Sequence, residues 1–491
     1  MGASSFFLQS DYIFFAFLAP ILLLLLLLLI NQRNKLVQSK KLPPGPSKLP
    51  LIGNLHQLRD LPHRSIQRLS DEHGPLMFLQ LGSIPTLVIS SADMAREIYK
   101  THGFVFSGRP ALYAAKKLSY NLSALTFAPY GEYWREVRKI VILELLSAKR
   151  VQSFQAVRDE EVALMLDSIA RSSGPPVNLS ELILLLTSNI VCRVTYGKKQ
   201  DGGEDKSRSR FHEILHETQD LLGGFCIADF FPWMGWLSKF NDKVIEEHLD
   251  PRRPEPEHED LVDVLLGVQK DSNQSIALSN DQIKGVLTDL FIAGTDTSSA
   301  TIVWIMTELI RNPSVMQRAQ TEVREAVKGK ERVEECHLPK LIYLKSVVKE
   351  GLRLHPPAPL LVPKETLENC TIEGYNIPAK TRVFVNAKSI GTDSKYWKYQ
   401  NEFQPERFLD SSIDFRGQHF ELLPFGAGRR GCPGINFAIL VIELAIANLL
   451  HRFDWELPQG IRRQDLDMEE AFGLTMHKKV PLCLVPNPVA L

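Results

Sequence analysis

The residues best suited to chemistry lie in the stretch 425–434, which reads Phe-Gly-Ala-Gly-Arg-Arg-Gly-Cys-Pro-Gly. Its glycines allow the backbone to approach a flat ligand and to direct amide N–H groups at the Cys432 sulfur, while Phe425 can shield one side. We expect Pro433 at the first position of an apolar helix over 435–450, because proline is favoured there. The positive end of that helix and the neighbouring arginines favour the thiolate of Cys432, the form that binds a metal ion.

Two other interpretations of this stretch need no metal ion. Gly426, Gly428 and Gly431 match the spacing of a dinucleotide-binding fingerprint. However, the chain after Gly431 is too short for the βαβ repeats that build such a domain. The other interpretation is that Cys432 is an inert buried thiol in a tight turn. A single cysteine without other motifs is more often a structural residue than a metal ligand.

A second chemical feature is an acid next to an alcohol, Asp296 and Thr297, within the polar stretch 293–299. Ser279 starts a capping-box pattern, and apolar residues then recur at helical spacing until Asn312. The polar stretch interrupts this pattern with glycine and hydroxyl residues, which compete for backbone hydrogen bonds. We expect one long, locally opened helix, and a loop between two helices is the alternative. A buried acid and alcohol in that opening are suited to passing protons inward.

The elements that position these residues belong to one large, mainly helical body. Two short apolar runs, 76–81 and 86–90, are separated by Gly82 and Pro85 and predict a β-hairpin. The six cysteines lie far apart with no Cys-x-x-Cys pair, which argues against a zinc module and a disulfide scaffold. Basic and acidic residues balance at 57 each, so no long-range field favours nucleic acid. We therefore predict a mainly α fold with small β-sheets.

An uncharged segment near the start of the chain predicts a membrane anchor. Residues 12–30 carry no charge and include eight consecutive leucines, which approaches the roughly 20 apolar residues that span a bilayer. A cleaved signal peptide is the alternative, but its apolar core is usually shorter and ends in small residues, whereas polar residues follow here. We expect one uncleaved transmembrane helix.

The charges around this segment predict its orientation. Basic residues follow the segment at Arg33, Lys35, Lys40 and Lys41. Because an excess of Lys and Arg marks the cytoplasmic flank of a membrane span, we expect residues 1–11 in the lumen and the body on the cytoplasmic side. Residues 31–50 are basic and rich in proline and predict a stiff hinge, which leads into a body over 51–491.

Taken together, these features resemble the cytochrome P450 superfamily. Its signature F-x-x-G-x-R-x-C-x-G is matched at Phe425, Gly428, Arg430, Cys432 and Gly434. Glu350 and Arg353 resemble the E-x-x-R helix motif of the family, and Arg407 resembles the arginine that completes a buried ion network with it. One E-x-x-R pair occurs on many helices, so only the ordered set of motifs is diagnostic. The resemblance implies the cytochrome P450 fold behind an N-terminal transmembrane helix.

The resemblance also implies a haem b cofactor whose iron is bound by the Cys432 thiolate. Trp134 and Arg138 match a W-x-x-x-R helix motif and, by the same resemblance, bind a haem propionate. Arg430 is expected to reach a propionate too. Lys364 stands where close relatives often carry arginine, so it would pair with a propionate as a point charge rather than a fork.

The stretch 293–297 resembles the oxygen-activation motif of the family, which assigns Asp296 and Thr297 to catalysis. In such enzymes the thiolate donates electron density that favours cleavage of the O–O bond. Segments that resemble the substrate-contacting regions are mostly apolar, and they are Pro110–Thr126, Leu290, Ala293, Ala358–Val362 and Leu474–Met476.

Three segments resemble the large plant clan of this superfamily that modifies natural products. They are the Pro-Pro-Gly-Pro stretch 43–46, the Cys-Pro-Gly form of the loop and the stretch 472–479. The resemblance implies NADPH-cytochrome P450 reductase as partner and a place in the endoplasmic reticulum membrane. It also implies hydroxylation or another oxidation of a small lipophilic metabolite of terpenoid, phenylpropanoid or alkaloid type, with O2 and NADPH-derived electrons.

Two alternatives to this function stay open. Around residues 237–244 the chain is shorter than its relatives, as if a helical part of the substrate-access roof were missing, which fits a catalytically impaired haem protein. The second alternative is a relative that isomerises or dehydrates without external oxygen. Asp296 and Thr297 argue for oxygen activation instead.

Overall fold

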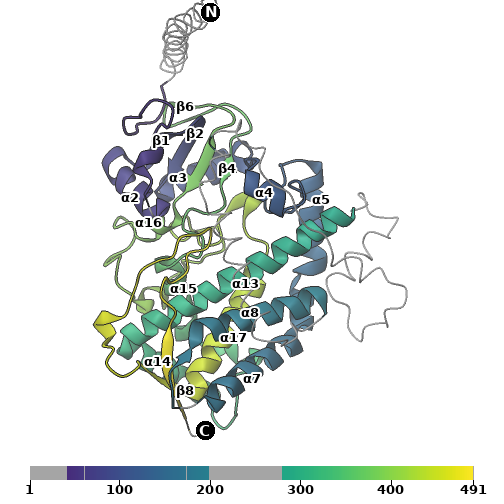
Figure 1. The fold of residues 1–491 in the computed structure, drawn as a ribbon, viewed down its shortest axis with the longest axis vertical. Coiled ribbons are helices and arrows are strands. Elements are labelled where there is room, and N and C mark those ends of the chain that lie inside the picture. The colour runs from purple at the N-terminus through teal and green to yellow at the C-terminus, as the bar shows by residue number, and fades with distance from the viewer. Residues whose placement is uncertain (1–40, 60, 173, 198–229, 231–278, 490–491) are drawn as a thin grey trace, which may run out of the picture.

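The computed structural model describes residues 41–59, 61–172, 174–197, 230 and 279–489. Within them the chain is mainly helical, and most of the long helices lie together below a region of small sheets in Figure 1. The α-helices are α2 Pro62–His73, α3 Ala92–Arg96, α4 Tyr113–Leu118, α5 Glu132–Ile140, α6 Ala148–Ser153, α7 Gln155–Arg171, α8 Leu179–Tyr196, α13 Asn280–Arg311, α14 Pro313–Ala326, α15 Ile342–Leu354, α16 Ala387–Gly391 and α17 Ile435–Arg452.

In the described part of the chain the strands form three small sheets. In sheet order they are β1 Leu76–Leu81, β2 Ile84–Ile89, β7 Arg382–Val385 and β4 Lys364–Glu365; β3 Val177–Asn178, β9 Cys483–Pro488 and β8 Phe453–Glu456; and β5 Cys370–Ile372 with β6 Tyr375–Ile377. The antiparallel pair β1 and β2 confirms the predicted hairpin. β7 adds to β2 in parallel, and β4 pairs with β7, which places Lys364 in this sheet.

The long helix predicted after Ser279 is α13, which runs diagonally across the molecule in Figure 1. Ser279 and Gln282 exchange the two hydrogen bonds of a capping box, as the sequence predicted. The predicted local opening is wrong, because residues 280–311 form one continuous α-helix. The hydroxyls of Thr297 and Thr301 donate to the carbonyl oxygens four residues earlier, so they join the helical bonds instead of replacing them.

α13 is the central helix of the body, and α8, α15 and α17 pack against it. Its second half is buried all round, since Trp304 and Ile305 are at most 1% exposed. Among the described residues, α8 and α17 are long and apolar enough to cross a membrane, but both pack into this core. The predicted anchor at residues 12–30 lies outside the described residues.

The Pro-rich half of the predicted hinge is bound to the body. The Phe78 N–H of β1 donates to the Pro44 carbonyl at 2.8 Å, and the Asn376 N–H donates to the Lys41 carbonyl at 2.7 Å. Gly45 lies so close to β1 that a Cβ atom would be 2.0 Å from the Phe78 carbonyl oxygen, so only glycine fits. These contacts fasten residues 41–45 to the sheet region of the body.

A buried ion network joins α15 to the short 3-10 helix Pro405–Phe408. Arg353 donates two hydrogen bonds of 2.7 Å to Glu350, and Arg407 donates a third to the same carboxylate at 3.0 Å. Arg353 also donates to the Gly391 carbonyl at 2.7 Å, which ties in α16. This is the arrangement that the E-x-x-R resemblance implied.

Candidate functional site

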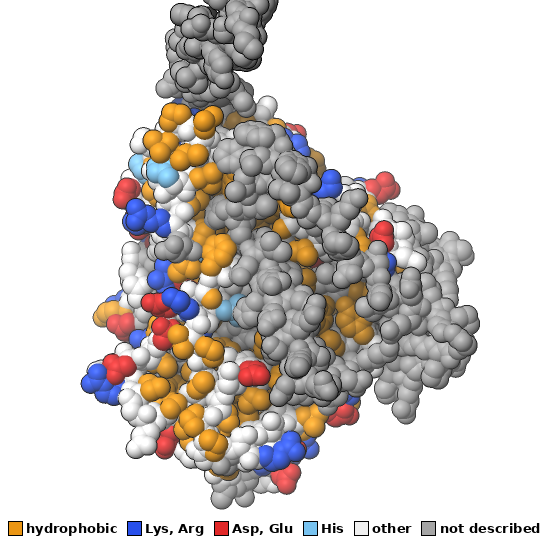
Figure 2. Space-filling model, in the orientation of Figure 1, with side chains coloured by type: hydrophobic (Ala, Val, Ile, Leu, Met, Phe, Trp, Pro, Cys, Tyr) orange, Lys and Arg blue, Asp and Glu red, His pale blue; other side chains and the backbone are white. Residues whose placement is uncertain are grey.

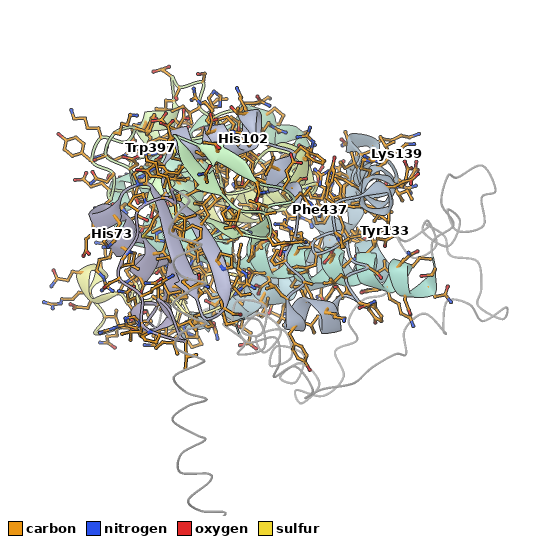
Figure 3. The ribbon with its side chains drawn as sticks, turned by 90° about the horizontal axis from the view of Figure 1, so that it is seen from above. His73, His102, Tyr133, Lys139, Trp397 and Phe437 are labelled. Carbon is orange, nitrogen blue, oxygen red and sulfur yellow. The ribbon has the colours of Figure 1, made fainter. Side chains whose placement is uncertain are left out.

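A cavity of about 300 Å³ lies between α13, α17 and the segment after α15, and most of its wall is apolar. Cys432, Thr297 and Lys364 line it together, although they are far apart in sequence. In Figure 3, Phe437 of α17, which also lines the cavity, lies in the interior, whereas Lys139 of α5 lies at the surface. The lining residues from the predicted substrate-contacting segments are Leu118, Ser119, Leu125, Thr126, Leu290, Ala293, Ala358, Leu361, Val362, Leu474 and Thr475. Such a wall suits a mostly apolar ligand.

The Cys432 loop is closed by its own backbone. The Cys432 N–H donates to the Phe425 carbonyl at 3.0 Å, and the Gly434 N–H donates to the Cys432 sulfur. The glycine-rich pattern predicted this amide-to-sulfur contact. α17 begins at Ile435, so Pro433 lies in the turn before the helix, and its predicted place at the first helical position is wrong. The sulfur therefore lies beside the start of α17 and at the cavity wall.

The charge state of Cys432 depends on opposing effects. Burial raises the pKa of the Cys432 thiol, whereas the Gly434 N–H and the positive charge of Arg138 lower it, and burial has the larger effect. The thiolate form of Cys432 stays a prediction. A metal cation bound to the sulfur would add to the stabilisation that the Gly434 N–H and Arg138 provide.

Phe425 lies at the cavity wall near Cys432. Its ring packs edge-to-face against Phe415, with 5.5 Å between the ring centroids. That the Phe425 ring shields the sulfur stays a prediction.

Four cationic side chains line the cavity, namely Arg109, Arg138, Lys364 and Arg430. Arg430 and Arg138 lie 4.1 Å and 5.4 Å from the centroid of the Trp134 ring, and Trp134 and Arg138 share one face of α5, as their spacing predicted. Burial lowers the pKa of all four, to about 10 for Arg109 and to about 8 for Arg430. Mutual repulsion adds to the lowering for Lys364 and Arg430. An anionic ligand would relieve this repulsion.

The same side chains hold the loops of the cavity together by donating to backbone carbonyl oxygens. The contacts are Arg430 to Ser107 at 2.9 Å and to Ala128 at 2.7 Å, Arg138 to Gly431 at 2.7 Å, and Trp134 to Leu125 at 3.1 Å. Binding of a haem propionate by these residues stays a prediction. Arg109, which donates to the Val362 and Pro363 carbonyls at 2.7 Å each, was missed, because it belongs to no motif.

The acid and the alcohol of α13 face different surroundings. Thr297 lines the cavity, and its hydroxyl donates to the Ala293 carbonyl at 2.6 Å. Asp296 is 2% exposed, and its Oδ1 lies 2.8 Å from Nε2 of His477. Sequence reasoning missed His477, because it lies 181 positions further along the chain.

A second carboxylate, Asp289, also lines the cavity from α13. Burial raises the pKa of Asp289 to about 6, although the Thr126 N–H, which donates to Oδ2 at 2.7 Å, and the charge of Arg109 lower it. Sequence reasoning missed this residue too. The signal was present, because steps of four residues lead from Asp289 through Ala293 to Thr297 along one face of the helix.

These features fit a flat, anionic, metal-containing cofactor. The cavity wall is mostly apolar, a sulfur faces it, and four cations with lowered pKa values line it. Haem combines these properties, since it carries iron and two carboxylates on an apolar ring.

Comparisons with known proteins agree with this site. The model of the family "Cytochrome P450" matches residues 43–484. Cytochrome P450 71A9 of Glycine max is 64% identical over 94% of this chain and 96% of its own length. Strychnine-11-hydroxylase of Strychnos nux-vomica is 58% identical over 93% of each chain. A solved structure of a zebra fish cytochrome P450 with abiraterone is 25% identical, with a TM-score of 0.73 over 88% of this chain and 100% of that chain.

The chain therefore belongs to the cytochrome P450 family, and it is a monooxygenase of that family. Membership confirms the predicted fold of the body, which is helix-rich with small sheets. Membership also implies that the enzyme uses a haem cofactor and receives electrons from a reductase. The dinucleotide-binding interpretation of the glycine-rich loop is thereby excluded.

Proposed function

We propose that this enzyme binds haem b through Cys432 and hydroxylates or otherwise oxidises a small lipophilic plant metabolite of terpenoid, phenylpropanoid or alkaloid type. The observation that carries the proposal is that the Cys432 sulfur and Thr297 line one mostly apolar cavity together with four cations. Relatives support a plant natural product as substrate. They include strychnine-11-hydroxylase and, at 44% identity over 93% of this chain, premnaspirodiene oxygenase of Hyoscyamus muticus.

The haem would be held by residues of the cavity wall. Cys432 would bind the iron, and Arg138, Arg430 and Lys364 with Trp134 would hold the propionates. Phe425 would lie beside the sulfur. When bound, the haem supplies oxygen activation, so that one oxygen atom enters the substrate and the other leaves as water.

Asp296 and Thr297 would control the supply of protons. The Thr297 hydroxyl lies at the cavity wall, and a hydroxyl both donates and accepts hydrogen bonds, so it can pass a proton onward. Asp296 is its neighbour in sequence and is shielded from solvent. The acid and alcohol pair would therefore be an entry point for protons.

The electrons would come from NADPH through NADPH-cytochrome P450 reductase, at the endoplasmic reticulum membrane. Residues 12–30 would form the single-pass anchor, with residues 1–11 in the lumen, residues 31–50 as a hinge, and residues 51–491 as the haem-binding domain on the cytoplasmic side. Apolar exposure near the start of the described chain supports this placement, since Leu51 is 70% exposed. Figure 2 shows hydrophobic side chains gathered at this end of the described surface.

The two alternative functions make different predictions. The stretch near 237–244, whose predicted shortening motivated the impaired haem protein, lies outside the described residues. An isomerase or dehydratase would not need oxygen or NADPH, whereas Asp296 and Thr297 suit oxygen activation. Relatives whose names include "hydroxylase" and "oxygenase" favour oxygen use as well.

The test is metabolite profiling of microsomes that contain the full chain and a reductase. Plant extracts are incubated with and without NADPH, and compounds that gain one oxygen atom are identified by mass spectrometry. Products that require NADPH, the reductase and O2 support the proposal. Haem incorporation without turnover across a broad panel would point to the impaired protein, and turnover independent of O2 would point to the rearranging relative.

A further inference from the structure

Asp296 is a buried acid whose partner comes from a distant part of the chain. Its Oδ1 lies 2.8 Å from Nε2 of His477, and the two side chains are 3% and 17% exposed. The second carboxylate oxygen of Asp296 is buried without a hydrogen-bond partner among the residues that the structure describes. The pair thus joins an enclosed carboxylate, next to Thr297, to an imidazole that solvent reaches.

The backbone around His477 is held in place by its neighbours. The Met476 N–H donates to the Pro357 carbonyl at 2.8 Å, and the Met476 carbonyl accepts from the Trp304 indole N–H at 2.9 Å. The His477 carbonyl accepts from the Ala471 N–H at 2.8 Å. Because Trp304 belongs to α13, the helix that carries the acid also fixes the backbone next to the imidazole. The fold therefore sets this contact.

The other charged groups of this region have partners of their own. The ion pairs are Glu470 with His63, Arg64 and Lys388, Lys478 with Asp467, Lys479 with Glu469, and Glu308 of α13 with His355 and Arg311. Although burial raises it, the hydrogen bonds and charges of its partners lower the pKa of Glu470 to about 2, so this acid stays ionised. His477 contacts the Asp296 carboxylate directly.

We propose that His477 is a proton-relay residue that resupplies Asp296 from solvent, an inference that rests on the function proposed above. Oxidation of a C–H bond by O2 to an alcohol and water consumes two electrons, here from the reductase, and two protons. In the relay, the N–H bond at Nε2 of His477 breaks, its proton bonds to Oδ1 of Asp296, and water reprotonates the ring. No electron moves in this step. Imidazole suits both halves of the exchange, because its ordinary pKa lies close to neutrality.

The rival explanation is that the pair only fastens the 470–479 segment to α13. His477→Gln separates the two explanations, because the amide N–H of glutamine can donate to Asp296 but does not exchange protons near neutral pH. His477→Ala removes both the contact and the relay. His56, which is exposed and lies in the N-terminal part of the body, provides the matched control His56→Gln.

The experiment uses the full chain in microsomes with reductase and NADPH and without added substrate, and it measures NADPH, O2 and hydrogen peroxide. Without substrate, O2 is reduced either to hydrogen peroxide, with two electrons and two protons, or to two water molecules, with four electrons and four protons that all come from NADPH oxidation and solvent. We expect His477→Gln to keep the melting temperature and the red-shifted absorption of the reduced carbon monoxide complex. The peroxide formed per NADPH should rise at least threefold. The dependence of this ratio on pH should also change, because the amide of glutamine does not titrate as an imidazole does.

Three outcomes would contradict the proton relay. Wild-type peroxide yield and pH profile in His477→Gln would overturn the relay while leaving the monooxygenase intact. An equal change in His56→Gln would overturn it as well, because the effect would not belong to the Asp296 pair. Absence of the red-shifted absorption in the wild-type chain would reject the proposed function and the relay with it. If His477→Ala does not fold, the glutamine variant alone decides.

Discussion

The ammonium group of Lys364 lies 5.0 Å from the centroid of the Tyr99 ring, and both side chains are buried in the wall of the cavity. Burial and three neighbouring arginines hold the pKa of Lys364 well below its usual range. Lys364→Met should therefore have two effects of opposite sign. The haem-free chain should gain about 1 kcal/mol of stability, because a buried charge is removed. The haem-loaded chain should lose haem roughly threefold to tenfold faster, because a propionate partner is lost.

Thermal unfolding of the haem-free chain and haem transfer to an apo-globin measure these two effects. Lys364→Arg is the control, since it keeps the cation, and it should retain haem like the wild type. If Lys364→Met loses haem at the same rate as the wild type, Lys364 does not bind the cofactor.

Cys432→Ser should abolish the red-shifted absorption of the reduced carbon monoxide complex. A hydroxyl at this position does not supply the thiolate that this spectrum requires. Difference spectra of microsomes provide the measurement. The exposed Cys483→Ser serves as the control and should leave the spectrum unchanged. A normal spectrum from Cys432→Ser would show that another residue binds the iron.

Thr297→Ala should keep that spectrum but divert reducing equivalents to hydrogen peroxide. The hydroxyl of Thr297 lies at the cavity wall, so its loss should interrupt proton transfer, while Cys432 and the cationic residues that would hold the haem stay in place. The ratio of peroxide formed to NADPH consumed should rise severalfold. Thr297→Ser, which keeps the hydroxyl, should stay near the wild-type ratio. Fully coupled turnover by Thr297→Ala would refute the assigned role.

Arg353→Met should destabilise the body by about 3–5 kcal/mol, because it leaves the buried Glu350 carboxylate without its main partner. Neither side chain of this pair is exposed. The fraction of haem-loaded protein and its unfolding in urea measure the effect. Arg462→Met breaks the exposed pair with Asp465 and should cost less than about 1 kcal/mol. If the two variants lose equal free energy of unfolding, the buried ion network does not contribute strongly to stability.

Glu443→Gln should stabilise the enzyme at alkaline pH. Burial raises the pKa of Glu443 to about 7, from an ordinary value of 4.5, although Lys345 and Arg416 lower it. The folded chain therefore holds this proton more tightly than the unfolded chain, so the stability that depends on Glu443 falls as pH rises from 4.5 to about 7. The melting temperature of the variant should match the wild type at pH near 5 and exceed it by roughly 2 °C or more at pH near 8. The exposed Glu456→Gln should show no such pH dependence.

Local features of the fold could be predicted from the sequence. The capping box at Ser279 and the hairpin β1–β2 depend on residues within a few positions of one another, so intrinsic preferences decide them without help from distant packing. The glycine-rich loop around Cys432 is equally local. Its ordered occurrence with the distant motifs implied the family, which the comparisons then showed.

Residue type and spacing were enough to predict a helical body, a sulfur at a helix start and an acid next to an alcohol within a long helix. Only the tertiary structure decided that His477 meets Asp296 and that Arg109 joins the other cations. It also decided that the Cys432 sulfur and Thr297 line the same cavity. The physical reason is that contacts and the loss of water depend on how distant segments pack, and a residue's type and neighbours in sequence do not specify its burial.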